Sequence, residues 1–588
     1  MSRERERDNF YDIKIEPDIG ERHNNSGHCR GHFQDCKRLQ GESVLVQLSR
    51  RFIHTFFGEI KATLAMFVRA SRLVHRLVAR LQLGLGYRLY STSRSNPSRF
   101  FSYVAVGAVS LYVGSLFGST TEKNELEPTT PLLERLQSTI PLSQLSTPVY
   151  ADNEQFEIAL KKILKIVGEE NYTTEPDVVK AHTDTFFSTH HPTDPQSQKP
   201  HVVIYPQSTE QVSQILKVAN KYKVPIVANS GLTSLEGQNM HTRGPNSISL
   251  SFPQLNKVLE FHPEDLDVQV QAGIGWQELD EFLLERDDGK HLMFGPDPGM
   301  GASIAGMVST SASGTNAYKY GTMKENVVNL TVVLADGTIV KTKQRPRKSS
   351  AGYDLTRLFI GAEGTLGIIT EITVKLHVRP IYEYVTIASF DTIKDAAATA
   401  QYVIGRSGLQ PNALEILNEA TVSFVNSSAA STKKFIAKPT LFFKLGGATE
   451  ESIAEQVAII KKIAEANNLI KLETSTNQED NALLWSARRH GLWSTFEYGQ
   501  RVLEDKEDVQ IWTTDIAVPI SKLAQVISET NDDLNNSGLK DRFAVMGHIG
   551  DGNCHFLLLY NTPQHKEVEK VVDRMVERAI KYEGTCTG

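Results

Sequence analysis

Apolar and polar residues alternate in two different rhythms through the first part of the folded body. Helical spacing predicts a helix at 156–167 and a second helix that starts at Ser208, where Gln211 forms a capping box. Short apolar runs at 201–206 and 223–228 lie on either side of the second helix and predict strands. We therefore expect a strand–helix–strand unit, and the loop that ends such a unit commonly receives phosphate groups.

The pattern changes at Tyr382, where longer strands begin to alternate with amphipathic helices. Strands are predicted at 384–390 and 440–447, and the apolar positions between Ile453 and Ala464 predict a helix. Just before this change, 329–342 reads as a hairpin with an Asp-Gly turn. The alternation after Tyr382 favours a second α+β domain, an antiparallel sheet covered by helices.

The stretch GPDPGMGASIAGMVSTSASGTNAYKYGT at 295–322 is rich in small residues. It holds six glycines and seven Ser/Thr hydroxyls, with one carboxylate and one lysine. Glycines at this frequency disfavour a helix, but they let backbone N–H groups approach a ligand, and such groups can hold a pyrophosphate. Apolar residues such as Ile304 and Met307 favour a ligand cradle over a flexible linker. The loop SGLTSLEG at 230–237 has a similar character, and G-x-G-x-x-G is absent.

The N-terminal segment differs from the body in charge. Residues 1–65 are polar and without apolar periodicity, whereas residues 66–99 hold seven arginines and no Asp or Glu. This composition is typical of a mitochondrial presequence, which we place at 66–90 with cleavage before Ser91. The alternative is an exposed basic helix. We expect Met66 to be the working initiator and the residues before it to be a non-native upstream extension.

The segment at 100–121 is uncharged throughout. As a helix it would span roughly 33 Å, enough for the core of a bilayer. Its glycines and serines make it only moderately apolar, so a buried core helix is the alternative. Its place after a presequence predicts a transmembrane anchor in the mitochondrial inner membrane, with the basic flank in the matrix and the body facing the intermembrane space.

The chain of 588 residues is too long for one core, so two or more domains are expected. Residues 1–119 carry 18 Lys/Arg and 10 Asp/Glu, and the net charge of −6 therefore leaves −14 on the remainder. This acidic body argues against nucleic acid as a partner. The four cysteines show neither zinc-type spacing nor a disulfide framework.

Two segments near the C-terminus carry the residue types of a catalytic site. Arg488 lies in LLWSARRHGLW, and a guanidinium can bind a carboxylate through two parallel hydrogen bonds; a helix-surface arginine is the alternative. His548 and His555 flank the Gly-Asp-Gly-Asn turn of VMGHIGDGNCHF. Two such histidines can converge on one zinc or manganese ion, which would polarise a substrate hydroxyl. The alternative is two hydrogen-bonding histidines beside a hairpin.

The loops at 230–237 and 295–322 resemble those of the vanillyl-alcohol-oxidase superfamily, whose members hold FAD between two α+β subdomains. The resemblance runs from about Pro200 to the end of the chain, and within the superfamily it is closest to the D-2-hydroxyacid dehydrogenases. It implies an α+β fold with a two-subdomain FAD-binding domain, plus an antiparallel-sheet cap domain with covering helices.

The resemblance also implies which residues bind FAD. The pyrophosphate loop would use Ser230, Gly231, Thr233 and Ser234, with Leu232 where a second glycine is usual. The other side of the cofactor would be lined by Pro296, Asp297, Gly299, Gly314, Thr315 and Gly321. Ile369 belongs to IGAEGTLGIIT, which resembles the strand that closes over the cofactor.

For the chemistry, the resemblance implies that Arg488 binds the substrate carboxylate and that His548 and His555 are catalytic metal ligands. The implied reaction is FAD-dependent oxidation of D-lactate to pyruvate with electron transfer to cytochrome c. D-2-hydroxyglutarate or another D-2-hydroxy acid is the alternative substrate, and a flavin-binding fragment without turnover is the alternative function. Relatives continue from T-C-T-G into E-H-G-V-G, which would supply a third ligand and a base. The sequence stops at Gly588, so we expect FAD binding with little metal and low turnover.

These expectations divide the chain into consecutive segments. They are an upstream extension at 1–65, a presequence at 66–90, an anchor at 100–121, a linker with a helical part at 122–196, the FAD-binding domain at 197–380, the cap at 381–530, and a C-terminal part with the histidines at 531–588.

Overall fold

The computed structural model describes residues 148–185 and 188–587. The predicted extension, presequence and anchor lie outside these residues. Within the described ranges, no helix is both long and apolar enough to cross a membrane. We refer to residues 148–380 as the first half and to residues 381–587 as the second half, because the apolar cores of the two parts are separate.

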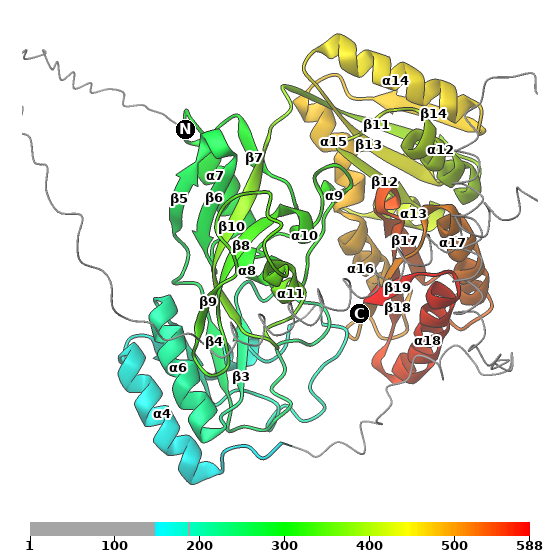
Figure 1. The fold of residues 1–588 in the computed structure, drawn as a ribbon. Helices are drawn as coiled ribbons and strands as arrows, with labels where there is room; N and C mark the ends of the chain where they lie inside the picture. Colours follow the sequence, from blue (N-terminus) through cyan, green and yellow to red (C-terminus); the bar gives the residue numbers. More distant parts are fainter. Residues whose placement is uncertain (1–147, 186–187, 588) are drawn as a thin grey trace, which may run out of the picture. The chain divides into compact units, whose positions relative to one another are not determined.

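A mainly parallel sheet opens the first half (Figure 1). Its strands, in spatial order, are β1 (Tyr172–Thr173), β2 (Val202–Ile204), β4 (Ile248–Ser251) and β3 (Ile226–Asn229). The predicted strand–helix–strand unit is present as β2, α6 (Thr209–Tyr222) and β3, but β4 lies between the two strands and pairs with both in parallel. The loop at 230–237 therefore leaves the carboxyl end of a parallel strand, as expected.

Two helices, α4 (Asn153–Val167) and α6, lie side by side and bury their apolar faces in the core of the first half (Figure 1). The hydroxyl of Ser208 accepts a hydrogen bond from the N–H of Gln211, which confirms the predicted start of α6. The prediction of a full capping box is wrong, because its second hydrogen bond, from the Ser208 N–H to the Gln211 side chain, is not formed. The Gln211 side chain accepts from the N–H of Gln207, the residue before the cap, at 2.8 Å.

A second sheet completes the first half and shares its apolar core with the first sheet. Its strands, in spatial order, are β5 (Val258–His262), β6 (Asp267–Gln271), β10 (Ile368–Val378), β8 (Val327–Val333) and β9 (Ile339–Lys341), and β7 (Leu292–Phe294) also pairs with β10. The pair of β8 and β9 confirms the predicted hairpin. The short helices of the first half are α5 (Pro176–Ala181), α7 (Trp276–Leu284), α8 (Ile304–Ser309), α9 (Ala317–Tyr320), α10 (Met323–Asn326) and α11 (Leu355–Phe359).

The second half is built on an antiparallel sheet, as predicted. Its strands, in spatial order, are β14 (Leu469–Thr474), β11 (Tyr382–Phe390), β13 (Thr440–Gly447), β12 (Ala413–Leu417), β17 (Phe543–Gly547), β18 (Asn553–Tyr560), β16 (Asp515–Ala517) and β19 (Thr585–Thr587), with β15 (Gln510–Thr513) also paired to β18. Strands from 531–588 thus join the sheet formed by strands from 381–530.

Helices cover both faces of this sheet (Figure 1). One face packs against α12 (Ile393–Arg406), α14 (Glu450–Glu465), α17 (Ile520–Asn535) and α18 (His565–Lys581). The other face packs against α13 (Glu419–Ser427), α15 (Gln478–Arg489) and α16 (Gly491–Val502). The second face carries the catalytic candidates.

The segment at 511–519 does not form one continuous strand. It is divided at Thr514 into β15 and β16. The Thr514 hydroxyl accepts a hydrogen bond from the N–H of Phe556, at 3.1 Å, in the facing strand β18. At this position a side-chain hydroxyl, rather than a backbone carbonyl, accepts the hydrogen bond from the facing strand, and the regular strand pairing is interrupted.

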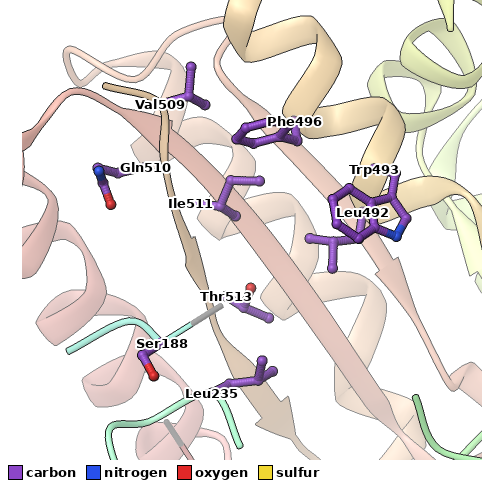
Figure 2. A pocket seen from close by; sticks show the side chains of 9 residues that line it. All are labelled: Ser188, Leu235, Leu492, Trp493, Phe496, Val509, Gln510, Ile511 and Thr513. Atoms are coloured by element: carbon purple, nitrogen blue, oxygen red, sulfur yellow. The ribbon is translucent and has the colours of Figure 1, made fainter. Parts of the chain in front are cut away.

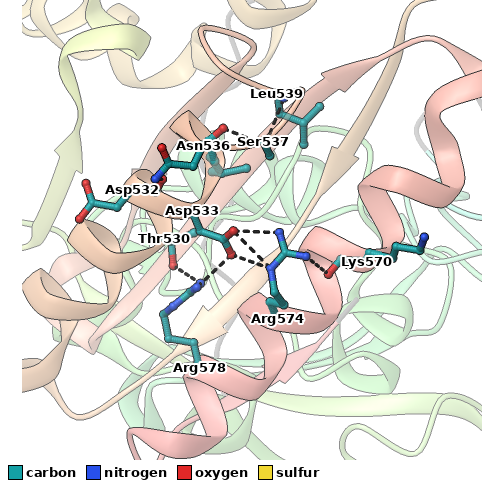
Figure 3. Close-up of polar contacts among 10 residues, drawn as sticks. Thr530, Asp532, Asp533, Asn536, Ser537, Leu539, Lys570, Arg574 and Arg578 are labelled. Carbon is teal, nitrogen blue, oxygen red and sulfur yellow. Dashed lines mark hydrogen bonds and ion pairs between the residues drawn. The ribbon is translucent and has the colours of Figure 1, made fainter.

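On the opposite face, α17 and α18 are joined by a polar network (Figure 3). The Asp533 carboxylate accepts hydrogen bonds from the guanidinium groups of Arg574 and Arg578. Arg578 also donates to the Thr530 hydroxyl at 2.9 Å. Because Asp533 and Arg578 are only 18% and 14% exposed, this network is better shielded from water than an ordinary surface ion pair.

Candidate functional site

The two glycine-rich loops of the first half meet at their backbones. A Cβ atom on Gly231 would lie 2.5 Å from the carbonyl oxygen of Gly301, so only glycine allows this approach. Gly299, by contrast, has open space where a side chain would begin. The structure therefore brings the loops at 230–237 and 295–322 together as the two sides of one cradle.

The first loop has the backbone geometry of an anion-binding site. Leu232 has a left-handed conformation with φ of 53°, and left-handed residues in short loops turn successive N–H groups to the same side. Within 148–185 and 188–587, no acceptor bonds the N–H groups of Gly231–Ser234, and the hydroxyls of Ser230, Thr233 and Ser234 have no partner. These donors fit a pyrophosphate.

Asp297 holds the second loop in shape rather than facing a ligand freely. Its carboxylate accepts hydrogen bonds from the Thr315 hydroxyl at 2.6 Å and from the Asn316 N–H at 2.8 Å. Gly314 has a φ of 144°, and a Cβ there would meet Asp297 at 2.5 Å. Burial raises the pKa of Asp297, although the Lys444 charge and these hydrogen bonds oppose the shift. Asp297 and Thr315 thus shape the cradle.

The remaining predicted cofactor residues lie in different surroundings. Pro296 is buried beside Asp297, and Gly321 has a φ of 82° as the C-terminal cap of α9, directly before the N-cap residue of α10. Ile369 is 6% exposed and lies in β10 within the apolar core of the first half. Ile369 is therefore a residue of the apolar core of the first half.

In the second half, a buried carboxylate joins two of the predicted catalytic residues. Glu415 lies in β12 with a fully buried side chain. Its Oε2 accepts from Nε of Arg488, which comes from α15, and its Oε1 accepts from Nδ1 of His548, which follows β17; both distances are 2.7 Å. Arg488 and His548, 60 residues apart in the sequence, are thus held by one acceptor.

The charges of this trio support one another. Burial raises the pKa of Glu415, but the charges and hydrogen bonds of His548 and Arg488 outweigh burial and hold the pKa below its usual range. Burial lowers the pKa of His548, but the Glu415 carboxylate more than offsets this and raises it. The carboxylate is therefore ionised in the folded protein, and the imidazole N–H bonds to it in either protonation state of the ring.

His548 and His555 lie close together, as predicted. Their ring centroids are 5.4 Å apart and the rings are nearly perpendicular. Nδ1 of His555 is 3.2 Å from the carbonyl oxygen of Thr514 and 3.6 Å from the Asp515 carboxylate. Burial lowers the pKa of His555 to about 4, so its imidazole is neutral at neutral pH. Across the described chain, no group of three or more His, Cys, Asp and Glu side chains is arranged to hold a metal.

Two lysines connect the cradle to the second half. Nζ of Lys319, in α9, donates to Asn412 at 2.6 Å. Nζ of Lys444, in β13, lies 3.3 Å from Asn316 Oδ1 and 4.5 Å from the centre of the Trp485 ring. Lys444 and Glu415 occupy the same face of neighbouring strands, because Lys444 pairs with Ala413 and Glu415 with Phe442. The catalytic face therefore adjoins the cradle.

A surface pocket near this region is lined by side chains that have no titratable group (Figure 2). It is lined by Ser188 and Leu235 from loops, by Leu492, Trp493 and Phe496 from α16, and by Val509, Gln510, Ile511 and Thr513. None of these side chains is a titratable acid or base, and none is a predicted site residue. Arg488, His548 and His555, the predicted catalytic residues, therefore lie outside the lining of this pocket.

The sequence reasoning missed two residues of this site, Glu415 and Lys444. Each is a charged residue inside a strand that is otherwise apolar, ALEIL at 413–417 and TLFFKLGG at 440–447. All five residues of β12 are buried. An unpaired charge in such a strand is destabilising, so an isolated Glu or Lys there indicates a paired or functional group. The sequence alone contains this indication.

The chain matches two family models. One, described as "FAD binding domain", matches residues 200–343, and the other, described as "FAD linked oxidases, C-terminal domain", matches residues 379–588. The first model covers both loops of the cradle, and the second covers the trio of Glu415, Arg488 and His548. The fold and the site therefore define a FAD-linked oxidase, and FAD is its cofactor.

Curated relatives define the family more narrowly. The chain is 48% identical over 451 residues to "D-lactate dehydrogenase (cytochrome), mitochondrial" of Kluyveromyces lactis, covering 76% of each chain. It is 42% identical over 520 residues to the Saccharomyces cerevisiae protein of that description, covering 85% of this chain and 86% of the other. For the Arabidopsis thaliana protein the identity is 41% over 428 residues, covering 72% and 71%. The chain belongs to this family, and the names support a mitochondrial location.

Solved structures confirm the fold. An alkyldihydroxyacetonephosphate synthase has a TM-score of 0.57 at 17% identity, covering 79% of this chain and 86% of the other. The 4-ethylphenol oxidase of Gulosibacter chungangensis has a TM-score of 0.58 at 21% identity, covering 75% and 90%. At these identities the likeness concerns architecture, and it confirms the predicted α+β fold of an FAD-binding domain with an antiparallel-sheet cap.

Proposed function

We propose that the chain oxidises D-lactate to pyruvate with FAD and passes the electrons singly to a cytochrome. The observation that carries this proposal is the arrangement of Arg488, His548 and His555 on the face of the sheet that adjoins the cradle. The family supports the substrate and the acceptor, since the three relatives are named as D-lactate dehydrogenases of the cytochrome type.

Arg488 would bind the carboxylate of the substrate. Its Nε is bonded to Glu415 and its Nη1 lies 3.6 Å from the sulfur of Met546, so Nη2 would make the charge-assisted bond with the substrate. His555 is a neutral imidazole at neutral pH because burial lowers its pKa to about 4, so its free ring nitrogen can serve either as a hydrogen-bond acceptor or as a metal ligand beside the substrate. Together these residues orient C2 of a 2-hydroxy acid.

Bound FAD supplies the acceptor for the hydride that leaves C2 of the substrate. The N–H groups and hydroxyls between Ser230 and Ser234 would hold the pyrophosphate, because they have no partner within the described residues. Gly299 would face the cofactor on the other side, where space is open, while Asp297 and Thr315 keep the loop in shape. The residues present thus fit FAD.

The test is reduction of the protein-bound flavin by single substrates without oxygen, followed by absorbance. We expect D-lactate to reduce the flavin and L-lactate to leave it oxidised. Reduction by L-lactate but not D-lactate would overturn the proposal. Faster reduction by D-2-hydroxyglutarate would favour the alternative substrate, for which Lys444 at the edge of the cradle offers the extra basic group that a second carboxylate needs.

We also propose that His548 and His555 bind a divalent metal, zinc or manganese. Each ring has Nδ1 bonded to a protein acceptor, and a histidine held in this way presents Nε2 to a metal. The metal would polarise the substrate hydroxyl. Titration of metal-free protein with zinc should show weaker binding in His548→Ala than in the control His191→Ala, whose ring pairs with Asp184 on a loop. Equal zinc affinity of the two variants would contradict the site.

For the location, we propose that residues 100–121 anchor the protein in the mitochondrial inner membrane, with the body in the intermembrane space. The arginine-rich segment at 66–90 and the mitochondrial relatives support this arrangement. Mass spectrometry of protein from purified mitochondria should show a mature N-terminus at Ser91, and any peptide from 1–65 would contradict it. Protease should reach the body once the outer membrane is opened, and protection of the body would contradict the orientation.

A further inference from the structure

Glu415 is a buried charge in an apolar strand. It lies in the middle of β12, where all five residues are buried, and its own side chain is 0% exposed. A carboxylate in such a place destabilises the fold unless charged or polar partners compensate it, and removal of one partner of a buried pair leaves an uncompensated charge. Its partners are therefore the reason that it can occupy this position.

Each of those partners is a predicted catalytic residue, and each uses a separate oxygen. Oε2 accepts from Arg488 and Oε1 accepts from His548. The bond to Arg488 uses Nε, and Nη1 lies 3.6 Å from the sulfur of Met546, so Nη2 is the guanidinium nitrogen without a bond in the described residues. The bond to His548 uses Nδ1 and leaves Nε2 as the other ring nitrogen.

These contacts fix directions as well as distances. A guanidinium bonded through Nε cannot rotate about its long axis without losing that bond, and an imidazole bonded through Nδ1 keeps one ring orientation and one tautomer. Because one rigid carboxylate serves both, the orientations of Arg488 and His548 depend on each other. Neither residue has another carboxylate partner within the described chain.

We propose that Glu415 is the positioning residue of the active site, which sets the mutual orientation of Arg488 and His548. The inference rests on the proposed function, because Arg488 and His548 are the groups that meet the substrate there. Glu415 itself does not touch the substrate. Its effect on turnover therefore passes through its two partners, which distinguishes it from a carboxylate that only stabilises the fold.

The experiment compares Glu415→Gln with the matched control Glu473→Gln. Glu473 also bridges two basic side chains, Lys433 and Lys471, but on the edge strand β14 of the same sheet. The amide of Glu415→Gln has one acceptor oxygen and turns its NH₂ group toward the other donor. We expect kcat/KM for D-lactate to fall at least thirtyfold, through both kcat and KM, with flavin content unchanged. Glu473→Gln should keep wild-type kinetics.

A double-mutant cycle measures how strongly the effects of two substitutions on kcat/KM depend on each other, and a purely structural role of Glu415 would not produce such a dependence on Arg488. If part of the effect of Glu415 passes through Arg488, then Glu415→Gln should lower kcat/KM clearly less in an Arg488→Met background than in the wild type, because only the part that passes through His548 remains. Equal effects in both backgrounds would overturn the proposal. If Glu415→Gln does not fold, Glu415→Asp takes its place, since a side chain one methylene shorter cannot reach both partners and should lower kcat/KM by tenfold or more.

The outcomes separate this inference from the proposed function. If wild-type protein with full flavin content does not oxidise D-lactate, the proposed function fails. If the wild type is active and Glu415→Gln keeps wild-type kcat and KM, the proposed function stands and the positioning role is wrong. Thermal unfolding of each variant, followed by far-ultraviolet circular dichroism, shows that the kinetic comparison is made between folded proteins.

Discussion

The guanidinium of Arg488 would serve two groups in the proposed function, because Nε is bonded to Glu415 and Nη2 would bind the substrate carboxylate. A lysine at this position keeps the charge, but a single ammonium cannot reach both groups with the planar geometry of arginine. The side chain is only 13% exposed, so water cannot easily replace a lost bond. The residue type, rather than the charge alone, is therefore what the site needs.

For Arg488→Lys we expect a higher KM for D-lactate and a fall in kcat/KM of tenfold or more, equivalent to about 1.4 kcal/mol of transition-state binding. Flavin content should not change, since the cradle lies in the first half of the chain. Steady-state kinetics with D-lactate and the flavin spectrum of the purified variant check both statements. Wild-type kinetics would show that Arg488 does not bind the substrate.

Gly231 is the residue at which the two sides of the cradle touch. In Gly231→Ala the new Cβ would lie 2.5 Å from the carbonyl oxygen of Gly301, and backbone atoms must move apart to relieve the clash. We expect flavin content per chain to fall severalfold, as measured by absorbance after desalting. Gly405→Ala, in α12 with no atom within 4 Å of the new Cβ, is the control. It should keep its flavin and gain up to about 1 kcal/mol of helix stability.

At the scale of elements, the sequence predicted the helices whose formation depends on neighbouring residues in the chain. The helices α4, α6 and α14 follow from apolar spacing, and α6 starts at its predicted cap, Ser208. The insertion of β4 between β2 and β3 could not be predicted, because parallel pairing joins segments that are distant in the chain and leaves no periodic signal. The division of 511–519 at Thr514 likewise depends on a partner in β18.

The candidate site shows the same division. His548 and His555 were predicted as a pair because a glycine turn links them, and the structure places their rings 5.4 Å apart. The contact of Glu415 with Arg488 spans 73 residues and crosses from a strand to a covering helix. No local pattern contains such a contact, although the lone carboxylate in β12 marks one of its members.

The network between α17 and α18 makes a prediction about stability (Figure 3). In Asp533→Asn the two arginines lose their shared carboxylate, and we expect the free energy of unfolding at neutral pH to fall by about 1–3 kcal/mol, between the values for exposed and buried pairs. The control is Asp532→Asn on the exposed side of the same helix, which should change stability by less than about 0.5 kcal/mol. Denaturant titration measures both.

The pH dependence of this effect has a defined sign. Hydrogen bonds from Arg574, opposed by partial burial and aided by Arg578, hold the pKa of Asp533 below its ordinary range. Such a group contributes stability above its unfolded pKa, about 3.9, and loses it as the pH falls through the lower folded pKa. The difference between wild type and Asp533→Asn should therefore be constant above about pH 5 and shrink below about pH 4. A difference that grows in acid would contradict the network.

At the scale of the whole molecule, charge is divided along the chain rather than spread evenly. The segment before residue 120 is basic, and the remainder carries a net charge of −14. A basic leader suits import, whereas an acidic body suits encounter with a basic one-electron carrier such as cytochrome c. Electrostatic attraction of this kind raises the rate of encounter more than it changes the chemistry of the site.

The acidic body therefore predicts how turnover depends on salt. With cytochrome c as acceptor, the rate at subsaturating cytochrome should fall severalfold or more between low ionic strength and about 0.5 M salt, because the screening length shrinks from about 30 Å at 0.01 M to below 10 Å. With a neutral quinone as acceptor, the same protein should show little change, which controls for an effect of salt on D-lactate oxidation itself. A rate with cytochrome c that is independent of salt would remove the electrostatic argument, while an equal fall with both acceptors would place the effect at the substrate site, where Arg488 and the lactate carboxylate are also charged.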